Sequence, residues 1–182
     1  MAKKPPKYNL DDLLTLTRKL FPSRFKNAPE ANTRLKKLIY TPFVGTKLLA
    51  IRGEVTGLAE DKIYKVIITF QNVDYVDAED ATHSVRVPVG AGTKKIVWMV
   101  PLKKKNEIKF RCGCLDSYFT SLYYAWQTNN IYGVKPRKYT RKTPPPPAGY
   151  PERNPAHEPI LCKHLLSVMT RIRKSKYYMG GV

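Results

Sequence analysis

Two short motifs contain the residues in this sequence that are best suited to bind a metal ion. They are Cys112-Gly-Cys114 and Cys162-Lys-His164, and together they hold all three cysteines of the chain. Three thiolates and one imidazole form a common ligand set for tetrahedral zinc. Because four protein ligands leave no open coordination position, we expect a structural site rather than a catalytic one. His157 is an alternative fourth ligand, but the short spacing places His164 beside Cys162.

The neighbours of the two motifs suit this chemistry. Gly113 is expected to let the backbone bend, so that both flanking sulfur atoms face one point. Arg111 and Lys163 flank the ligands, and positive charge lowers the pKa of a thiol. The second ring nitrogen of His164 is expected to donate to a carbonyl or a carboxylate, and Asp116 is a candidate acceptor.

The elements around the two motifs must bring them together. Cys112 ends a predicted strand over residues 107–112, and Cys162 lies near the start of a predicted helix over Pro159–Arg173. Residues 131–159 are rich in proline, which disfavours both helix and central strand. Closing so long a loop costs a few kcal/mol, whereas structural zinc supplies on the order of 10 kcal/mol in peptides. We therefore expect the metal to hold the two ends of this loop.

The remainder of the sequence predicts an α+β fold. Asn9 is a suitable N-cap for a helix over residues 10–20, and a second helix is expected over 29–39. Segments rich in β-branched and aromatic residues predict strands over 47–55, 63–73, 82–89, 94–100 and 107–112. Their close spacing predicts a small antiparallel sheet or a partial barrel.

These elements divide the chain into four regions. A basic N-terminal arm with helices covers residues 1–45, and an antiparallel β region covers 46–111. The zinc-binding region, 112–174, combines an aromatic helix, the proline-rich loop and a C-terminal helix, and a tail covers 175–182. For the aromatic helix over 116–130 we expect core packing, with base stacking as the alternative.

The net charge is the second strong feature of the sequence. The chain has 33 Lys and Arg residues against 14 Asp and Glu residues, which gives a formal net charge of +19 at pH 7. Such an excess favours an acidic partner, either nucleic acid or an acidic protein surface, with plain solubility as the alternative. Candidate contact residues lie in three basic stretches: Lys103, Lys104, Lys105, Lys138, Arg141, Lys142, Arg171 and Arg173.

Several function classes are disfavoured. No apolar run is long enough to span a bilayer, and the basic N-terminus lacks the apolar segment of a signal peptide. No Ser–His–Asp arrangement, P-loop or HExxH motif is present, so we expect neither an enzyme nor a small-molecule substrate. The acidic segment 74–80 lacks the glycine and the ligand spacing of a calcium loop, so we expect a solvated turn there.

The order Cys-x-Cys, then Cys-x-His at long range, resembles the SWIM zinc finger. That resemblance covers Cys112, Cys114, Cys162 and His164 and no more than residues 106–170. It implies a small ββα-like zinc unit that binds DNA or protein. The insertion between the two pairs is longer here than in a typical finger of that family.

A broader pattern over residues 47–170 resembles uncharacterised virion proteins of tailed bacteriophages. It comprises the strand IYKVIITFQNVDY, the run FRCGC at 110–114, the aromatic helix, the stretch TPPPPAGYPERNP at 143–155 and the CKHL at 162–165. This resemblance implies a structural part of a virus particle, such as a baseplate, tail or head–tail junction component. Its partners would be other virion proteins, in multiple copies.

Two hypotheses of different classes follow. The first is a structural phage protein with a zinc ion, made in the host cytoplasm and located in the virion. The second is a nucleic-acid-binding zinc-finger protein. The two functions are compatible where a particle protein faces packaged DNA.

Overall fold

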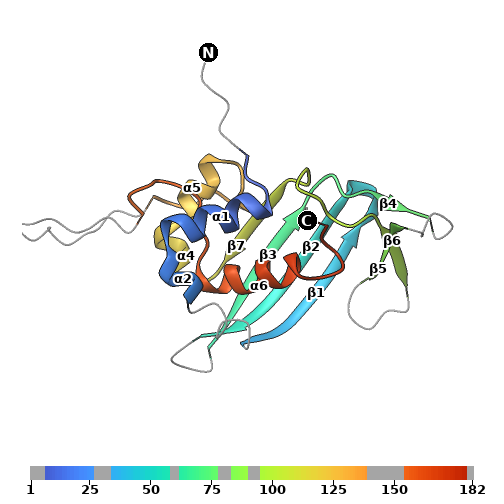
Figure 1. The fold of residues 1–182 in the computed structure, drawn as a ribbon, viewed down its shortest axis with the longest axis horizontal. Coiled ribbons are helices and arrows are strands. Elements are labelled where there is room, and N and C mark those ends of the chain that lie inside the picture. Colours follow the sequence, from blue (N-terminus) through green and yellow to red (C-terminus); the bar gives the residue numbers. More distant parts are fainter. Residues whose placement is uncertain are drawn as a thin grey trace, which may run out of the picture.

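The computed structural model describes residues 7–26, 34–57, 62–77, 83–89, 95–138 and 154–179. Within these ranges, helices pack against one face of an antiparallel sheet, and a second, smaller sheet lies beyond its end (Figure 1). The predicted α+β class is confirmed, and neither sheet closes into a barrel in the described part of the chain.

The larger sheet has the strand order β1-β2-β3-β7, with every neighbouring pair antiparallel. Its strands are β1 (Leu35–Phe43), β2 (Leu48–Thr56), β3 (Ile63–Phe70) and β7 (Ile108–Cys112). The smaller sheet has the order β4-β6-β5, from β4 (Tyr75–Val76), β5 (Val85–Pro88) and β6 (Ile96–Met99). All five predicted strands are therefore present, each with slightly different bounds.

The predicted helix over residues 29–39 is wrong. Residues 35–43 form strand β1, and residues 29–33 lie outside the described part of the chain. Leu38 pairs with Gly53 and Tyr40 with Ile51, so β1 extends the sheet by one edge strand. The lysines and leucines of this segment have good helix propensity, but pairing with β2 outweighs a preference of a few tenths of a kcal/mol per residue.

The N-terminal helix is confirmed as α1 (Leu10–Leu20), followed by α2 (Pro22–Lys26). Asn9 and Asp12 form a reciprocal capping box, in which each side chain accepts from the backbone N–H of the other. Asp11 holds two later residues: Arg173 pairs with it at 2.7 Å, and the Tyr178 hydroxyl donates to it at 2.9 Å. Burial and this hydrogen bond raise the pKa of Tyr178 above its usual value.

The predicted aromatic helix is interrupted at Ser121. It forms α4 (Leu115–Thr120) and α5 (Leu122–Gln127), and the buried Ser121 hydroxyl donates to the carbonyl of Ile160. Leu122 and Ala125 face the core, as core packing requires. The aromatic rings are less buried: Lys135 lies 3.9 Å above the Trp126 ring centroid.

The C-terminal helix is α6 (Lys163–Arg173), shorter at its start than predicted, and it lies across the larger sheet (Figure 1). Val168 is fully buried between helix and sheet. A Cβ added to Gly53 of β2 would lie 2.8 Å from Val168 Cγ2, which is shorter than carbon atoms can approach. Glycine at this position therefore allows α6 to pack directly on the strand. No helix in the described ranges is long and apolar enough to cross a membrane.

Gly53→Ala tests this close approach. We expect the substitution to lower the free energy of unfolding by about 1–3 kcal/mol, because the added methyl group overpacks a buried contact. Gly45→Ala is the matched control, since a Cβ there has no neighbour within 4 Å. Urea denaturation of both variants measures the difference. Equal stability of the two variants would show that α6 does not rest on Gly53.

Candidate metal centre

The four predicted metal ligands come together at the ends of three elements. Cys112 is the last residue of β7, Cys114 is the N-cap of α4, and Cys162 is the N-cap of α6. His164 lies in the first turn of α6. The structure therefore joins the end of the sheet to the start of the helix that covers it, as the sequence predicted.

The geometry of this cluster suits a tetrahedral ion. All four ligand atoms lie within 4.8 Å of one another, and Cys112 Sγ is 3.8 Å from His164 Nδ1. Zinc–sulfur bonds of about 2.3 Å in a tetrahedron place neighbouring sulfur atoms about 3.8 Å apart. Small side-chain rotations would close the remaining difference. The three cysteines are buried and His164 is half-buried, so these residues could hold a metal ion shielded from water.

Backbone conformation explains how residues two apart can share one ion. Cys114 is extended, with φ −82° and ψ 152°, and it continues the direction of β7. Alternate side chains of an extended chain point to the same side, which brings the sulfur atoms of Cys112 and Cys114 together. Cys162 is likewise extended, with φ −72° and ψ 166°, and the helix starts only after it.

The expected role of Gly113 is wrong. The left-handed backbone conformation that favours glycine does not occur there, since Gly133 is the only glycine with positive φ in the described residues. A Cβ added to Gly113 would meet only the carbonyl oxygen of Lys65, at 4.0 Å. The extended conformation alone aligns the two cysteines, and it is accessible to any residue.

Hydrogen bonds between the thiols shift the pKa values of Cys112 and Cys114 in opposite directions. The Cys112 and Cys162 side chains both lower the pKa of Cys114, and the backbone N–H of Ser117 donates to its sulfur at 3.3 Å. The hydrogen bond with Cys114 raises the pKa of Cys112 to about 12, and burial raises that of Cys162 well above its usual value. A cation that binds here would replace thiol protons, as metal binding to cysteine requires.

Arg24 of α2 connects the two halves of the cluster, and sequence reasoning missed it. Its guanidinium donates to the carbonyl of Leu161 at 2.6 Å and to the carboxylate of Asp116 at 2.8 Å. Leu161 directly precedes Cys162, and Asp116 follows Cys114 by two residues. Nothing in the local sequence of α2 indicates this role, because both partners are distant along the chain. The backbone N–H of Leu161 is also fixed, at 3.0 Å from Thr17 Oγ1.

Two expectations about neighbouring residues are not met. Asp116 accepts from Arg24 and not from His164, whose ring stacks on Tyr64 with centroids 4.3 Å apart. Arg111 donates to the carbonyls of Tyr132 and Val134. It points away from the sulfur atoms, because adjacent residues of a strand face opposite sides.

The alternative ligand His157 lies elsewhere. It stacks on Tyr124, with ring centroids 5.2 Å apart and an interplanar angle of 7°, and it is not part of the cluster. Most of the proline-rich loop, residues 139–153, lies outside the described part of the chain. The described residues on either side of it, up to 138 and from 154, connect to the two halves of the cluster.

The described residues among the predicted nucleic-acid contacts lie on different elements. Lys103, Lys104 and Lys105 are exposed in a turn before β7, and Lys105 pairs with Asp74 at 3.2 Å. Lys138 lies 5.7 Å above the ring centroid of Tyr123.

The remaining basic candidates differ in their surroundings. Arg173 pairs with Asp11, whereas Arg171 lines a groove on the same helix. Arg141 and Lys142 lie outside the described residues.

Compared with known proteins, the chain matches no family model, no curated protein and no solved structure at a significant level.

Cys162→Ala tests the metal cluster. We expect the unchanged protein to carry about one zinc ion and the variant to lose it, with a lower melting temperature, because three remaining ligands no longer close the site. His157→Ala is the control and should retain the metal. Elemental mass spectrometry and thermal denaturation measure both effects. A protein without metal, or a Cys162→Ala variant with full occupancy, would contradict the assignment.

Arg24→Met tests the bridge between the two halves. It removes both hydrogen bonds while keeping much of the side-chain volume, and we expect the zinc affinity to fall about 10- to 100-fold, as for other partners that orient ligands. Competition with a chromogenic chelator measures the affinity. Arg52→Met, on the opposite face of the sheet, is the control and should leave it unchanged. An unchanged affinity in the Arg24 variant would limit that residue to general stability.

Proposed function

We propose that this chain is a non-catalytic structural component of a tailed phage particle, stabilised by a zinc ion. The observation that carries the zinc part of this proposal is the cluster of three buried cysteines and one histidine. Four protein ligands complete a tetrahedron, so the ion would have no position for a substrate or a reactive water. The proposal therefore assigns the metal to architecture.

The chemistry of the donor atoms favours zinc over other metals. Thiolate and imidazole ligands suit zinc, whereas calcium and magnesium prefer oxygen. The ion would join β7 to α6 and so fix the two ends of the segment between Cys114 and Cys162. Structural zinc supplies on the order of 10 kcal/mol in peptides, which exceeds the few kcal/mol needed to close such a loop.

The assignment to a phage particle rests on the virion-protein resemblance over residues 47–170. Two features of the molecule support an assembly role. In the sequence, the proline-rich segment lies between the two halves of the candidate metal cluster, which suits a loop that docks on a neighbouring subunit. The net charge of +19 suits contact with acidic protein surfaces or with packaged DNA. A baseplate, tail or head–tail junction position would provide such partners.

A second candidate function is nucleic-acid binding. The observation that favours it is the large excess of positive charge, since neutralising phosphates is the main source of non-specific affinity for nucleic acids. This function is compatible with the first at a position in the particle that faces DNA.

Mass spectrometry of purified particles tests the primary proposal. In a preparation of the phage that encodes this chain, we expect its peptides at a level that corresponds to several copies per particle. They should persist after a high-salt wash, which removes proteins held only by surface charge. A known non-structural protein of the same phage is the control for contamination. Presence in infected cells with absence from washed particles would overturn the virion assignment and leave the zinc cluster unaffected.

A further inference from the structure

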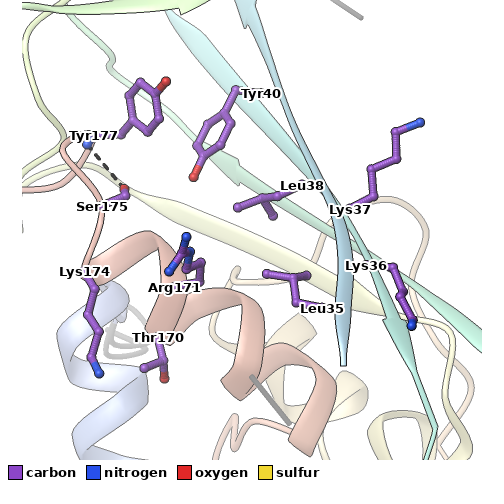
Figure 2. Close-up of a pocket in the computed structure, with 10 residues that line it drawn as sticks. All are labelled: Leu35, Lys36, Lys37, Leu38, Tyr40, Thr170, Arg171, Lys174, Ser175 and Tyr177. Atoms are coloured by element: carbon purple, nitrogen blue, oxygen red, sulfur yellow. Dashed lines mark hydrogen bonds between the residues drawn. The ribbon is translucent and has the colours of Figure 1, made fainter. Parts of the chain in front are cut away.

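The edge strand β1 and the C-terminal half of α6 enclose a groove that the zinc cluster does not use. Its volume is about 600 Å³. Figure 2 shows that one wall comes from β1 and the other from α6 and the segment that follows it. The lining residues are Leu35, Lys36, Lys37, Leu38, Tyr40, Thr170, Arg171, Lys174, Ser175 and Tyr177.

The charge of this groove has one sign. Four basic residues contribute to its lining, and no Asp or Glu does within the described part of the chain: Lys36, Lys37, Arg171 and Lys174. Arg171 and Lys174 belong to the wall formed by α6 and the residue after it, whereas the side chains of Lys36 and Lys37 leave β1 on the side away from α6 (Figure 2). No ion pair among the described residues involves any of the four. Arg173 differs, because it pairs with Asp11 outside the groove. Cations beside a concave surface attract and retain an anionic ligand.

Apolar and aromatic groups lie between these cations. Leu35, Leu38 and Tyr40 point from β1 across the groove toward α6 (Figure 2). The Tyr40 ring packs against Tyr177, with centroids 4.4 Å apart and an interplanar angle of 40°. A ligand that fits must therefore combine negative charge with flat or apolar parts.

Single-stranded nucleic acid has this combination. Its phosphates bind to cations, while its unpaired bases stack on aromatic rings or contact aliphatic side chains. A duplex hides the faces of its bases, and an acidic peptide has carboxylates without regularly placed planar rings. The mixture of tyrosine, leucine and cationic side chains favours the single strand over both alternatives.

We propose that the groove between β1 and α6 binds single-stranded nucleic acid. Arg171 and Lys174 contact the phosphates, and the surface around Tyr177 contacts the bases. This inference rests on the second candidate function, nucleic-acid binding, and gives that function a location. It does not depend on the phage assignment.

Fluorescence anisotropy with a short labelled oligothymidylate tests the groove. The double variant Arg171→Gln/Lys174→Gln removes two groove charges from the exposed side of α6. Lys19→Gln/Lys95→Gln removes the same charge from exposed positions that do not line the groove. We expect the groove variant to bind about tenfold more weakly, with a salt dependence reduced by about 1.4 in the log–log slope. The control should lose less than about threefold, because distant charges are screened.

The outcomes separate the groove from the function on which it rests. Equal weakening in the two double variants, with binding retained, would overturn the groove but leave nucleic-acid binding in place. Absence of salt-sensitive binding by the unchanged protein would overturn both. Equally tight binding of a duplex of the same length, or full competition by polyglutamate, would overturn the assignment to a single strand. Equal melting temperatures of the two variants exclude loss of fold as the cause.

Discussion

The position of α6 is constrained because its first residues must meet Cys112 and Cys114 to form the candidate metal cluster. The sulfur atoms of Cys112 and Cys114 leave the end of β7, and the remaining ligands stand at the start of α6. A helix fixed at that end can pack on the sheet only if the strand beneath it has no side chain in the way. Gly53 meets this requirement below Val168, because it has no Cβ. Arg24 and Thr17 then hold the segment before Cys162 from the opposite side. The candidate metal cluster, the sheet packing and the N-terminal helices thus depend on the same few contacts.

The few acidic residues also determine where positive charge remains without an ion-pair partner. Acidic residues are few, and several of the described ones pair within the molecule, where Asp11, Asp74, Glu107 and Asp116 each meet a lysine or arginine. Ion pairs between segments that are distant in the sequence, such as Arg24 with Asp116, help to position the elements that they join. Exposed ion pairs add little to the free energy of unfolding. Arg171 and Lys174, which form no ion pair with another described residue, lie where α6 approaches β1. The same shortage of acids that makes the chain basic also gives that groove a single sign.

The sequence was sufficient for features with a local signal. The capping pattern around Asn9 predicted α1, and β-branched segments predicted five strands, because these patterns reflect each segment's own periodicity. The ligand set was predictable because cysteines are rare in this chain and their spacing is distinctive. Strand β1 was missed, since its stability comes from pairing with β2, and the break at Ser121 depends on the distant carbonyl of Ile160. Arg24 was missed for the same reason: it contacts Leu161 and Asp116, which are distant in the sequence and come near it only in the folded chain.

The contacts of Asp11 have a consequence for how the chain folds during synthesis. Its carboxylate forms an ion pair with Arg173 and accepts from the Tyr178 hydroxyl, so the partners that fix α1 against the rest of the molecule leave the ribosome long after α1 itself. The antiparallel strands β1, β2 and β3 are consecutive and can pair early, whereas α1 has to wait with its apolar face uncovered. This interval exposes Leu10, Leu13 and Leu14 to other nascent chains or to chaperones. Translation speed over the proline-rich segment would set how long that exposure lasts.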